Sequence, residues 1–442
     1  MKKKICLLAV VAALTAAACS SKTPSNGDPT DVPEMTVTVA PTDEPEATAT
    51  PEPTATPKPT ATPTPDVDWY EEMLKSSLTT TGNNARLKKV IEKARSGETV
   101  NIAAIGGSVT EGAGAQTMLG GYAYQFADAF AETYGTDKGS NINFVNAGLG
   151  GTPSSLGVIR YHRDVIEELG AEPDLLILEF SVNDYGEVTS GRAYESLIYD
   201  VLSQDNDAAV ILVFAVFKSK WNMQGDYIPV GKYYDLPMVS IRDAISVPYL
   251  QGNLNDKKFF SDEYHPTTYG HTIMSDCIMH LIAEIDKEEA DEMNALPETG
   301  RKPLDFCKVE MINDESEGVE ITKGSFTLVD SAVQYFVGRP SFPDNWKHDG
   351  TAGNESFTMT LTCKNLLLNY KTANGADFGD AEVYVDGEKV MTLQGRTAGG
   401  WNNSNVVLVI DETTAAEHTV EVRMAEGQED KAFTILALGY TK

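Results

Sequence analysis

Two short stretches of this chain hold residue types that together can perform acyl transfer. Residues 101–112, NIAAIGGSVTEG, run from an apolar segment into a glycine pair and Ser108. Residues 261–271, SDEYHPTTYGH, place Asp262 three residues before His265. A serine hydroxyl becomes a nucleophile when a histidine takes its proton and a carboxylate orients that histidine. The Asp262–His265 segment would equally suit a turn that caps the next helix, so these residues alone leave both interpretations open.

Three other kinds of glycine-rich loop fit the residues around Ser108 poorly. A phosphate-binding Walker loop needs a lysine after its last glycine, and none follows Gly106. Neither GGSVTEG nor GLGGTPS has the GxGxxG spacing of a dinucleotide-binding loop. The GxSxG turn of α/β-hydrolases also fails, because Thr110 stands where its last glycine belongs.

The chain has six histidines, and His265 differs from the rest in its setting. It precedes the last expected helix of the first folded region, in a loop held by Pro266. The others fall inside helical patterns or in the last part of the chain, where a structural role is the better explanation: His162, His271, His280, His348 and His418.

The residues from 67 to 295 alternate between expected strands and helices, which predicts an α/β domain. The expected strands are 100–105, 141–148, 174–180 and 208–217, and the expected helices are 85–97, 122–135, 156–170, 194–202 and 267–288. The strands are continuously apolar, which is typical of a parallel sheet covered on both faces. Ser108 follows the first of these strands, at the end where such sheets place their ligands.

The pattern changes in residues 301–442, where apolar and polar residues alternate with a period of two. Five stretches show it, namely 356–372, 381–393, 405–412, 418–425 and 432–440. The sequence VDGEKV within the second stretch is a strong hairpin signal. Short strands separated by turn residues predict a second domain that is a β-sandwich.

The first 66 residues contribute to neither domain. Residues 1–19 combine three lysines, an apolar run and small residues before Cys19, which predicts an export signal ending in a lipidated cysteine. An ordinary secretory signal with an incidental Cys19 is the alternative. Residues 20–66 hold 11 of the chain's 21 prolines and predict a disordered spacer. The protein is therefore expected outside the cytoplasm, anchored to the membrane by lipid.

Charge and cysteine content limit the partners. The formal net charge is −30, and it becomes −33 when Lys2, Lys3 and Lys4 leave with the signal. So acidic a chain repels phosphate backbones, and nucleic acid is a poor partner. The three later cysteines are Cys277, Cys307 and Cys363, and they lack the spacing of a metal site. The sequence does not decide whether two of them form a disulfide.

Four blocks in order resemble the SGNH (GDSL-type) hydrolases. The strand followed by IGGSVTEG matches the first block, which makes Ser108 the nucleophile. NAGLGG matches the second block and puts the family's oxyanion glycine on Gly151. SVND matches the third and puts the oxyanion asparagine on Asn183. DEYHP matches the last block, with Asp262 and His265 as the acid and base.

This resemblance covers roughly residues 98–285 and implies a flavodoxin-like three-layer α/β/α domain; the β-sandwich expected after it is of jelly-roll type. It implies ester hydrolysis without a metal or organic cofactor, with the N–H of Ser108 joining Gly151 and Asn183 around the oxyanion. Two residues depart from the family pattern. Gly107 replaces the aspartate of GDS, and Ser181 replaces the first glycine of the third block, where the backbone near Asn183 is expected to be tighter.

The substrate is expected to be a polysaccharide. Export on a long tether and a β-sandwich the size of a carbohydrate-binding module favour an O-acetyl esterase for plant cell-wall glycans such as xylan or mannan. A peptidoglycan O-acetylesterase, a lipid esterase or lysophospholipase, and a non-catalytic glycan-binding lipoprotein are the alternatives. Trp221 is expected near the active-site end of the sheet. Trp346 and Trp401 either stack on sugars or fill an end of the sandwich.

Overall fold

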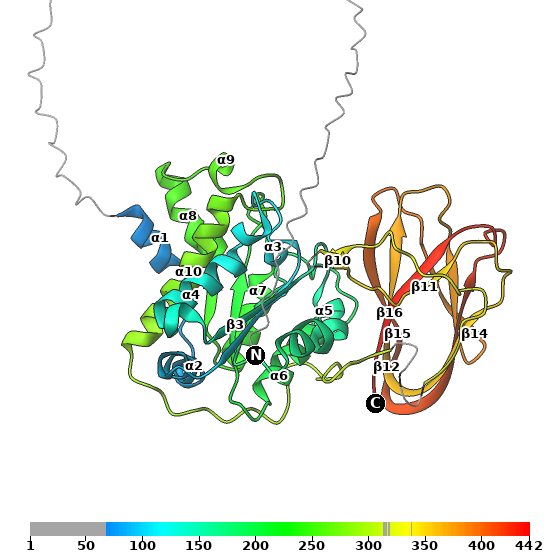
Figure 1. Cartoon of the computed structure of the whole chain (residues 1–442), viewed down its shortest axis with the longest axis horizontal. Coiled ribbons are helices and arrows are strands. Elements are labelled where there is room, and N and C mark those ends of the chain that lie inside the picture. The colour runs from blue at the N-terminus through cyan, green and yellow to red at the C-terminus, as the bar shows by residue number, and fades with distance from the viewer. Residues whose placement is uncertain (1–67, 313–315, 317–318, 337) are drawn as a thin grey trace, which may run out of the picture. The chain divides into compact units, whose positions relative to one another are not determined.

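The structure is a computed structural model that describes residues 68–312, 316, 319–336 and 338–442. The predicted export signal, Cys19 and the spacer to residue 66 lie outside these residues. Among the described residues, no helix has both the length and the apolar character that a membrane span requires. The described chain consists of an α/β domain followed by a domain of β-strands (Figure 1).

The α/β domain is built on a six-stranded sheet in the order β1-β6-β5-β4-β2-β3. The strands are β1 (Leu78–Thr80), β2 (Val100–Gly106), β3 (Ile142–Gly148), β4 (Leu175–Glu179), β5 (Ala209–Phe214) and β6 (Met238–Ser240). Neighbouring strands from β2 to β6 pair in parallel, and β1 pairs antiparallel at the edge. The parallel part has the strand order of a flavodoxin-like sheet, so the predicted fold is confirmed.

Helices cover the sheet and connect its strands. The helices of this domain are α1 (Trp69–Ser77), α2 (Ala85–Ser96), α3 (Ser108–Glu111), α4 (Tyr122–Tyr134), α5 (Ser154–Tyr161), α6 (Arg192–Leu202), α7 (Gln224–Tyr233), α8 (Ile241–Gln251), α9 (Asp256–Phe259) and α10 (Thr268–Lys287). The expected helix 156–170 is α5 continued by a π-helical segment, His162–Glu167. The helices α7 and α8 were not expected, because Pro229 and Pro248 interrupt their helical patterns.

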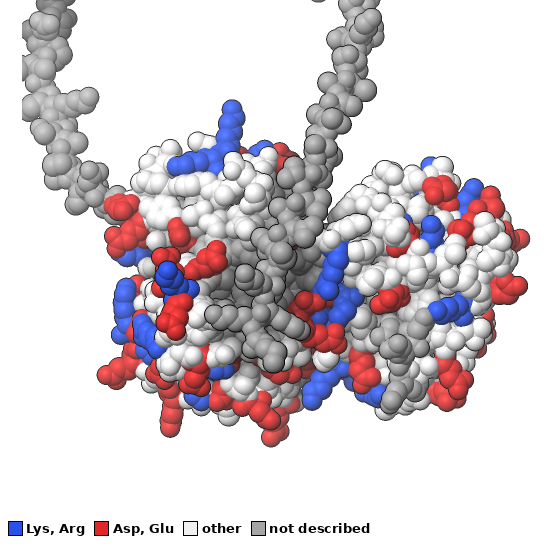
Figure 2. Space-filling view, viewed as in Figure 1, with Lys and Arg blue, Asp and Glu red and all other residues white. Residues whose placement is uncertain are grey.

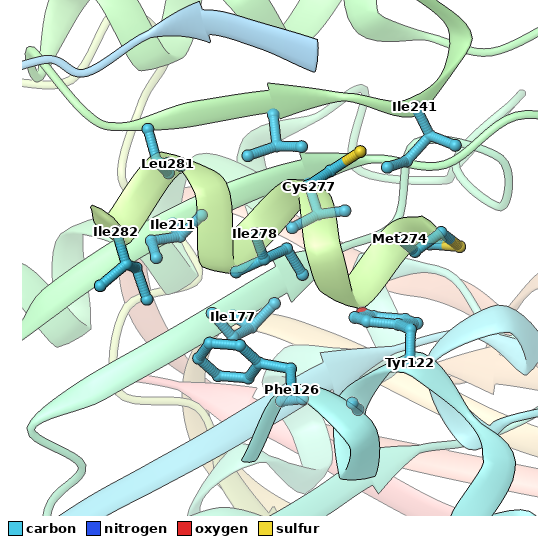
Figure 3. Close-up of a cluster of buried hydrophobic side chains, with 14 of the residues drawn as sticks. Tyr122, Phe126, Ile177, Ile211, Ile241, Met274, Cys277, Ile278, Leu281 and Ile282 are labelled. Atoms are coloured by element: carbon cyan, nitrogen blue, oxygen red, sulfur yellow. The ribbon is translucent and has the colours of Figure 1, made fainter. Parts of the chain in front are cut away.

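Two apolar clusters lie on opposite faces of the sheet. Alternate residues of β2 face opposite ways, so Ile102 belongs to one cluster and Ala103 to the other. Figure 3 shows the first cluster, in which side chains of α10 such as Ile278 gather with Ile177 of β4 and Phe126 of α4. Because α10 packs so closely on the sheet, the segment just before it is held at the carboxyl ends of the strands.

The β domain is an antiparallel sandwich, as predicted. Its strands are β7 (Glu310–Ile312), β8 (Glu320–Thr322), β9 (Tyr335–Phe336), β10 (Arg339–Pro340), β11 (Trp346–His348), β12 (Phe357–Ala373), β13 (Ala381–Val385), β14 (Glu388–Leu393), β15 (Trp401–Met424) and β16 (Phe433–Thr441). The predicted hairpin is β13–β14, and its turn residues Asp386 and Gly387 both have positive φ, at 52° and 83°.

One expectation for this domain needs correction. Residues 405–412 and 418–425 were expected as two strands, and they are parts of one long strand, β15. Its pairing with β12 shifts at this point, since Cys363 pairs with Ala416 but Asn365 pairs with Asp411. The extra residues of β15 form an exposed bulge. Such a bulge lets one strand bend and contribute to both layers of a sandwich, which a turn-based expectation does not foresee.

The two domains share a buried core. Phe306, Val309 and Leu436 of the C-terminal part belong to the same apolar cluster as residues of α5 and α6. The chain between the domains is also fixed, because the buried Glu195 carboxylate accepts the backbone N–H groups of Arg301 and Lys302. On the face shown in Figure 2, basic side chains stand among acidic ones rather than forming a broad positive patch.

The fully buried Arg160 of α5 ties the ends of two strands together. Its guanidinium donates to the carbonyl oxygens of Ala147 (2.5 Å) and Gly106 (3.1 Å) and pairs with Asp164 at 3.3 Å. Gly106 is the last residue of β2, and Ala147 is the second-to-last residue of β3. The loops that carry Ser108 and Gly151 start from these two strand ends.

We expect Arg160→Leu to lower the free energy of unfolding by about 3–5 kcal/mol, because it leaves two buried carbonyl groups and a buried carboxylate without their partner. Urea denaturation measures this loss. The matched control is Arg95→Leu, which breaks a half-exposed ion pair with Asp286 and should cost about 1 kcal/mol or less. Equal effects of the two substitutions would contradict this role of Arg160.

Candidate active site

Three side chains predicted from distant parts of the sequence meet in the structure. The Oγ of Ser108 lies 3.0 Å from Nε2 of His265, and Nδ1 of His265 lies 2.8 Å from Oδ2 of Asp262. With Nδ1–H donating to the carboxylate, Nε2 is left as an acceptor for the serine hydroxyl. This is the hydrogen-bond geometry of a serine nucleophile with its base and orienting acid.

The Asp262 carboxylate is held in its ionised form. Burial would raise the pKa of Asp262, but hydrogen bonds from the His265 ring and from the backbone N–H groups of Tyr264 and His265 outweigh it and lower that pKa. The backbone bonds to Oδ1 measure 2.7 and 2.8 Å. The turn-forming and histidine-orienting interpretations of this segment are therefore compatible, because the same carboxylate does both.

The strand order explains why the predicted blocks meet. β2 lies between β3 and β4, so the loops that leave the carboxyl ends of these three strands adjoin at the switch point of the sheet. α3 begins at Ser108, directly after β2. The second loop is tied to the first by Asn146, whose side chain donates to the Thr110 carbonyl oxygen at 2.8 Å and accepts from Gly148 N–H at 2.9 Å.

The predicted oxyanion residues lie around Ser108. The Asn183 side chain packs against Gly107, where an added Cβ would lie 2.1 Å from Oδ1 and 2.9 Å from Nδ2. A Cβ placed on Gly150 would lie 3.7 Å from the Ser108 Cβ, so the second loop passes beside the serine. No described residue accepts a hydrogen bond from the Gly151 N–H, which leaves this donor available to a ligand.

The two departures from the family pattern have structural reasons. Gly107 stands where the family has aspartate, and the space for any side chain there is filled by Asn183. Ser181 gives a partner to a buried carboxyl group, since its hydroxyl lies 3.1 Å from Oε1 of Glu179. Burial raises the pKa of Glu179 to about 7, although bonds from Ser181 oppose this. Ser181 therefore makes a buried polar contact two residues before Asn183.

A third carboxylate connects the loops after β3 and β4. Asp184, next to the predicted oxyanion residue Asn183, is buried and accepts the Ser154 N–H at 2.7 Å and the Tyr227 hydroxyl at 2.5 Å. Ser154 is the first residue of α5, which follows the glycine loop. The position of Asn183 is therefore coupled to the position of the second loop.

Comparisons with known proteins agree with this arrangement. Residues 104–273 match the GDSL-like Lipase/Acylhydrolase family. A solved two-domain esterase active on acetylated mannans aligns with a TM-score of 0.71 and 26% identity, covering 84% of this chain and 99% of that chain. This chain is a carboxylic ester hydrolase with a GDSL-type domain. A structure of the mannan esterase co-crystallised with mannopentaose aligns with a TM-score of 0.70 and 25% identity, covering 84% and 98% of the two chains. No curated protein sequence matches this chain.

Two of the remaining histidines of the esterase have structural surroundings. His271 is fully buried, with Nδ1 accepting the Tyr122 N–H at 3.2 Å and Nε2 donating to the Ala113 carbonyl oxygen at 3.0 Å. His348 is buried among backbone carbonyls of the β domain. The three later cysteines are free, and no cluster of three or more His, Cys, Asp or Glu side chains suited to a metal ion occurs among the described residues.

The sequence did not place Trp401 in the site. Trp346 is buried in the sandwich core, but Trp401 is 56% exposed at the start of β15. A Cβ placed on Gly151 would lie 3.5 Å from Cζ2 of Trp401. The β domain thus contributes an exposed ring beside the glycine loop that follows β3. Its aromatic character and loop-like sequence were the only available signal.

A row of aromatic rings leads away from His265 on the α/β domain. Tyr264 contacts Phe217 edge to face with centroids 5.2 Å apart, and Phe217 stacks on Trp221 at 5.8 Å. Trp221 in turn contacts Tyr185 at 5.8 Å, and Tyr185 is 82% exposed. We call these four residues the aromatic row. Trp221 lies near the active-site end of the sheet, as expected, and Trp401 provides a second aromatic surface at the oxyanion loop.

The buried His271 predicts a pH dependence of stability. Burial lowers its pKa from 6.5 to about 4, so the unfolded chain binds more protons than the folded chain between these values. The contribution of the neutral, buried His271 to the free energy of unfolding is therefore fully present above pH 6.5 and is lost as the pH falls toward 4.

We expect the wild type to lose about 3 kcal/mol more free energy of unfolding between pH 7 and pH 4 than His271→Gln, which keeps a donor and an acceptor but does not titrate. Urea denaturation at each pH gives the free energy of unfolding of both proteins. The titration of carboxylates common to both cancels when the two values are subtracted. Parallel pH profiles for the two proteins would show that His271 makes no such contribution.

Proposed function

We propose that the esterase acts outside the cytoplasm and removes O-acetyl groups from a cell-wall polysaccharide, with Ser108 as its nucleophile. The observation that carries the proposal is the 3.0 Å contact between Ser108 Oγ and His265 Nε2, completed by the bond from His265 to Asp262. The export signal expected in residues 1–19 supports the location.

The reaction begins when His265 Nε2 accepts the hydroxyl proton of Ser108 as Oγ attacks the acetyl carbonyl carbon. The tetrahedral intermediate expels the sugar alkoxide, which takes the proton from His265 and leaves the acetyl group on Ser108. Water then attacks this acyl-enzyme, with His265 again as base, and acetate is released. Asp262 keeps the imidazole in one orientation and stabilises its protonated form in both halves of the reaction.

The negative charge of the intermediate develops on the former carbonyl oxygen. The N–H groups of Ser108 and Gly151 and the side-chain amide of Asn183 are the proposed donors to it. Each such donor is worth about 10²–10³ in rate when it is fixed before the reaction. The packing of Asn183 against Gly107, and the bonds of Asp184, supply this fixed geometry.

Two observations support a polysaccharide as the substrate. The mannan esterase described above resembles this chain over both of its domains rather than over the catalytic domain alone. Exposed aromatic rings also lie near the proposed nucleophile, because Trp401 adjoins the Gly150–Gly151 loop and the aromatic row begins at Tyr264, next to His265. Flat apolar faces with polar edges suit sugar rings, which are themselves apolar on their faces.

The substrate is tested by acetate release from acetylated mannan, acetylated xylan and O-acetylated peptidoglycan, with a long-chain nitrophenyl ester and nitrophenyl acetate alongside. Ser108→Ala serves as the blank. We expect release from a plant glycan and from nitrophenyl acetate, both abolished by the substitution. Release from peptidoglycan alone, or rates that rise with acyl chain length, would contradict the substrate class. Activity surviving in Ser108→Ala would contradict the mechanism.

Trp401 is expected to bind sugar rings of the polymer. We expect Trp401→Ala to raise KM for the acetylated polymer about tenfold, corresponding to loss of roughly 1.4 kcal/mol of stacking, with a smaller effect on nitrophenyl acetate. Val390→Ala, which removes another exposed apolar side chain of the same domain, is the matched control. Initial rates against polymer concentration give both values. An unchanged KM for the polymer would remove Trp401 from the binding surface.

A further inference from the structure

The peptide group between Gly150 and Gly151 carries the proposed oxyanion donor of the second loop. Neither residue has a side chain to hold it, and Gly151 has a positive φ of 68°. A peptide flanked by two glycines can rotate with little steric resistance. Rotation of this peptide would turn the Gly151 N–H away from the intermediate, so something else must fix it.

One side of the loop is restrained from within the α/β domain. The Leu149 N–H donates to the Gly106 carbonyl oxygen at 3.0 Å, and a Cβ placed on Gly150 would lie 2.9 Å from Oε2 of Glu111. These contacts restrain the chain before the peptide group between Gly150 and Gly151. The catalytic domain therefore fixes the loop up to Gly150 but does not fix the peptide that presents the proposed donor.

The β domain supplies the missing contact through Gln334. Its Nε2 donates to the Gly150 carbonyl oxygen at 2.8 Å, and its Oε1 accepts the Ser404 N–H at 2.7 Å. Gln334 is 7% exposed, so water competes little for these bonds. Ser404 belongs to β15, the strand that also presents Trp401.

A peptide group is planar, and its C=O and N–H point in opposite directions. A donor fixed on the Gly150 carbonyl oxygen therefore fixes the direction of the Gly151 N–H. It also polarises this peptide group, which makes the N–H a better donor. We propose that Gln334 is a positioning residue for catalysis, through which the β domain orients the oxyanion peptide of the catalytic domain.

The residue type suits this task. An amide offers a donor and an acceptor, and the Ser404 N–H can bond only to the oxygen, which turns the NH₂ toward Gly150. A glutamate in this place would present a carboxylate oxygen to the carbonyl oxygen and repel it. A methionine would keep the length and packing of the side chain but make neither strong hydrogen bond.

A merely structural role at the domain contact would have a different signature. Loss of that role would lower stability and leave the chemistry of the folded protein unchanged. Loss of an oriented oxyanion donor instead weakens transition-state binding, so kcat falls while KM for a small substrate changes little. A small ester is the right probe, because it does not need the aromatic surfaces that a polymer needs.

The experiment uses the full chain, nitrophenyl acetate and a small alkylboronic acid, which forms a tetrahedral adduct with an active-site serine. We expect Gln334→Met to lower kcat about 10- to 100-fold and to weaken boronic acid binding by a similar factor. Gln334→Glu should be impaired further. Gln428→Ala is the matched control, because the side-chain oxygen of this β-domain glutamine accepts the Asp380 N–H, and the kcat of this variant should stay within about twofold of the wild type.

The outcomes separate this inference from the proposed function on which it rests. If the wild type hydrolyses the small ester and Ser108→Ala does not, the roles of the nucleophile hold independently of Gln334. A kcat within twofold of the wild type for both Gln334 variants, with or without a lowered unfolding midpoint, would then overturn the positioning role. A fall in kcat without a matching loss of boronic acid affinity would also overturn it.

Discussion

The hydrogen bond between Ser108 and His265 depends on two segments that are 157 residues apart and are held independently. Ser108 is fixed by the end of β2, whose last carbonyl accepts the buried Arg160. His265 is fixed by the turn before α10, where the Thr267 side chain caps the helix by accepting the Gly270 N–H. The apolar cluster of Figure 3 clamps α10 to the sheet, so the distance between the two side chains follows from packing over the whole domain.

The β domain is packed against the catalytic domain and contacts its active-site loops. It shares a buried core with α5 and α6, and two of its residues reach the glycine loop after β3. Gln334 contacts the backbone of that loop, whereas Trp401 lies over it with its ring exposed. In our proposal Gln334 serves the chemical step and Trp401 serves recognition, although a hydrogen bond from Ser404 joins Gln334 to the strand that carries Trp401.

The sequence predicted the features that are local and missed those that depend on tertiary contact. The parallel sheet and the family blocks could be predicted because each motif, such as IGGSVTEG, combines an apolar strand with its own loop residues. The roles of the site residues remain predictions, but the structure brings their side chains together. The sequence could not indicate a role for Gln334, because it lies 184 residues from Gly150 and no sequence pattern identifies such a distant contact. The bulge of β15 was missed for a similar reason, since it appears only in the register with β12.

We propose that His265 activates Ser108 as the nucleophile. Labelling with a small fluorophosphonate, followed by intact mass measurement and peptide mapping, tests it directly because this reagent reacts with activated serines. We expect one adduct per chain, located on Ser108, and labelling slowed by about 10³ or more in His265→Ala. An adduct on a different residue, or equally fast labelling of Ser108 in His265→Ala, would contradict it.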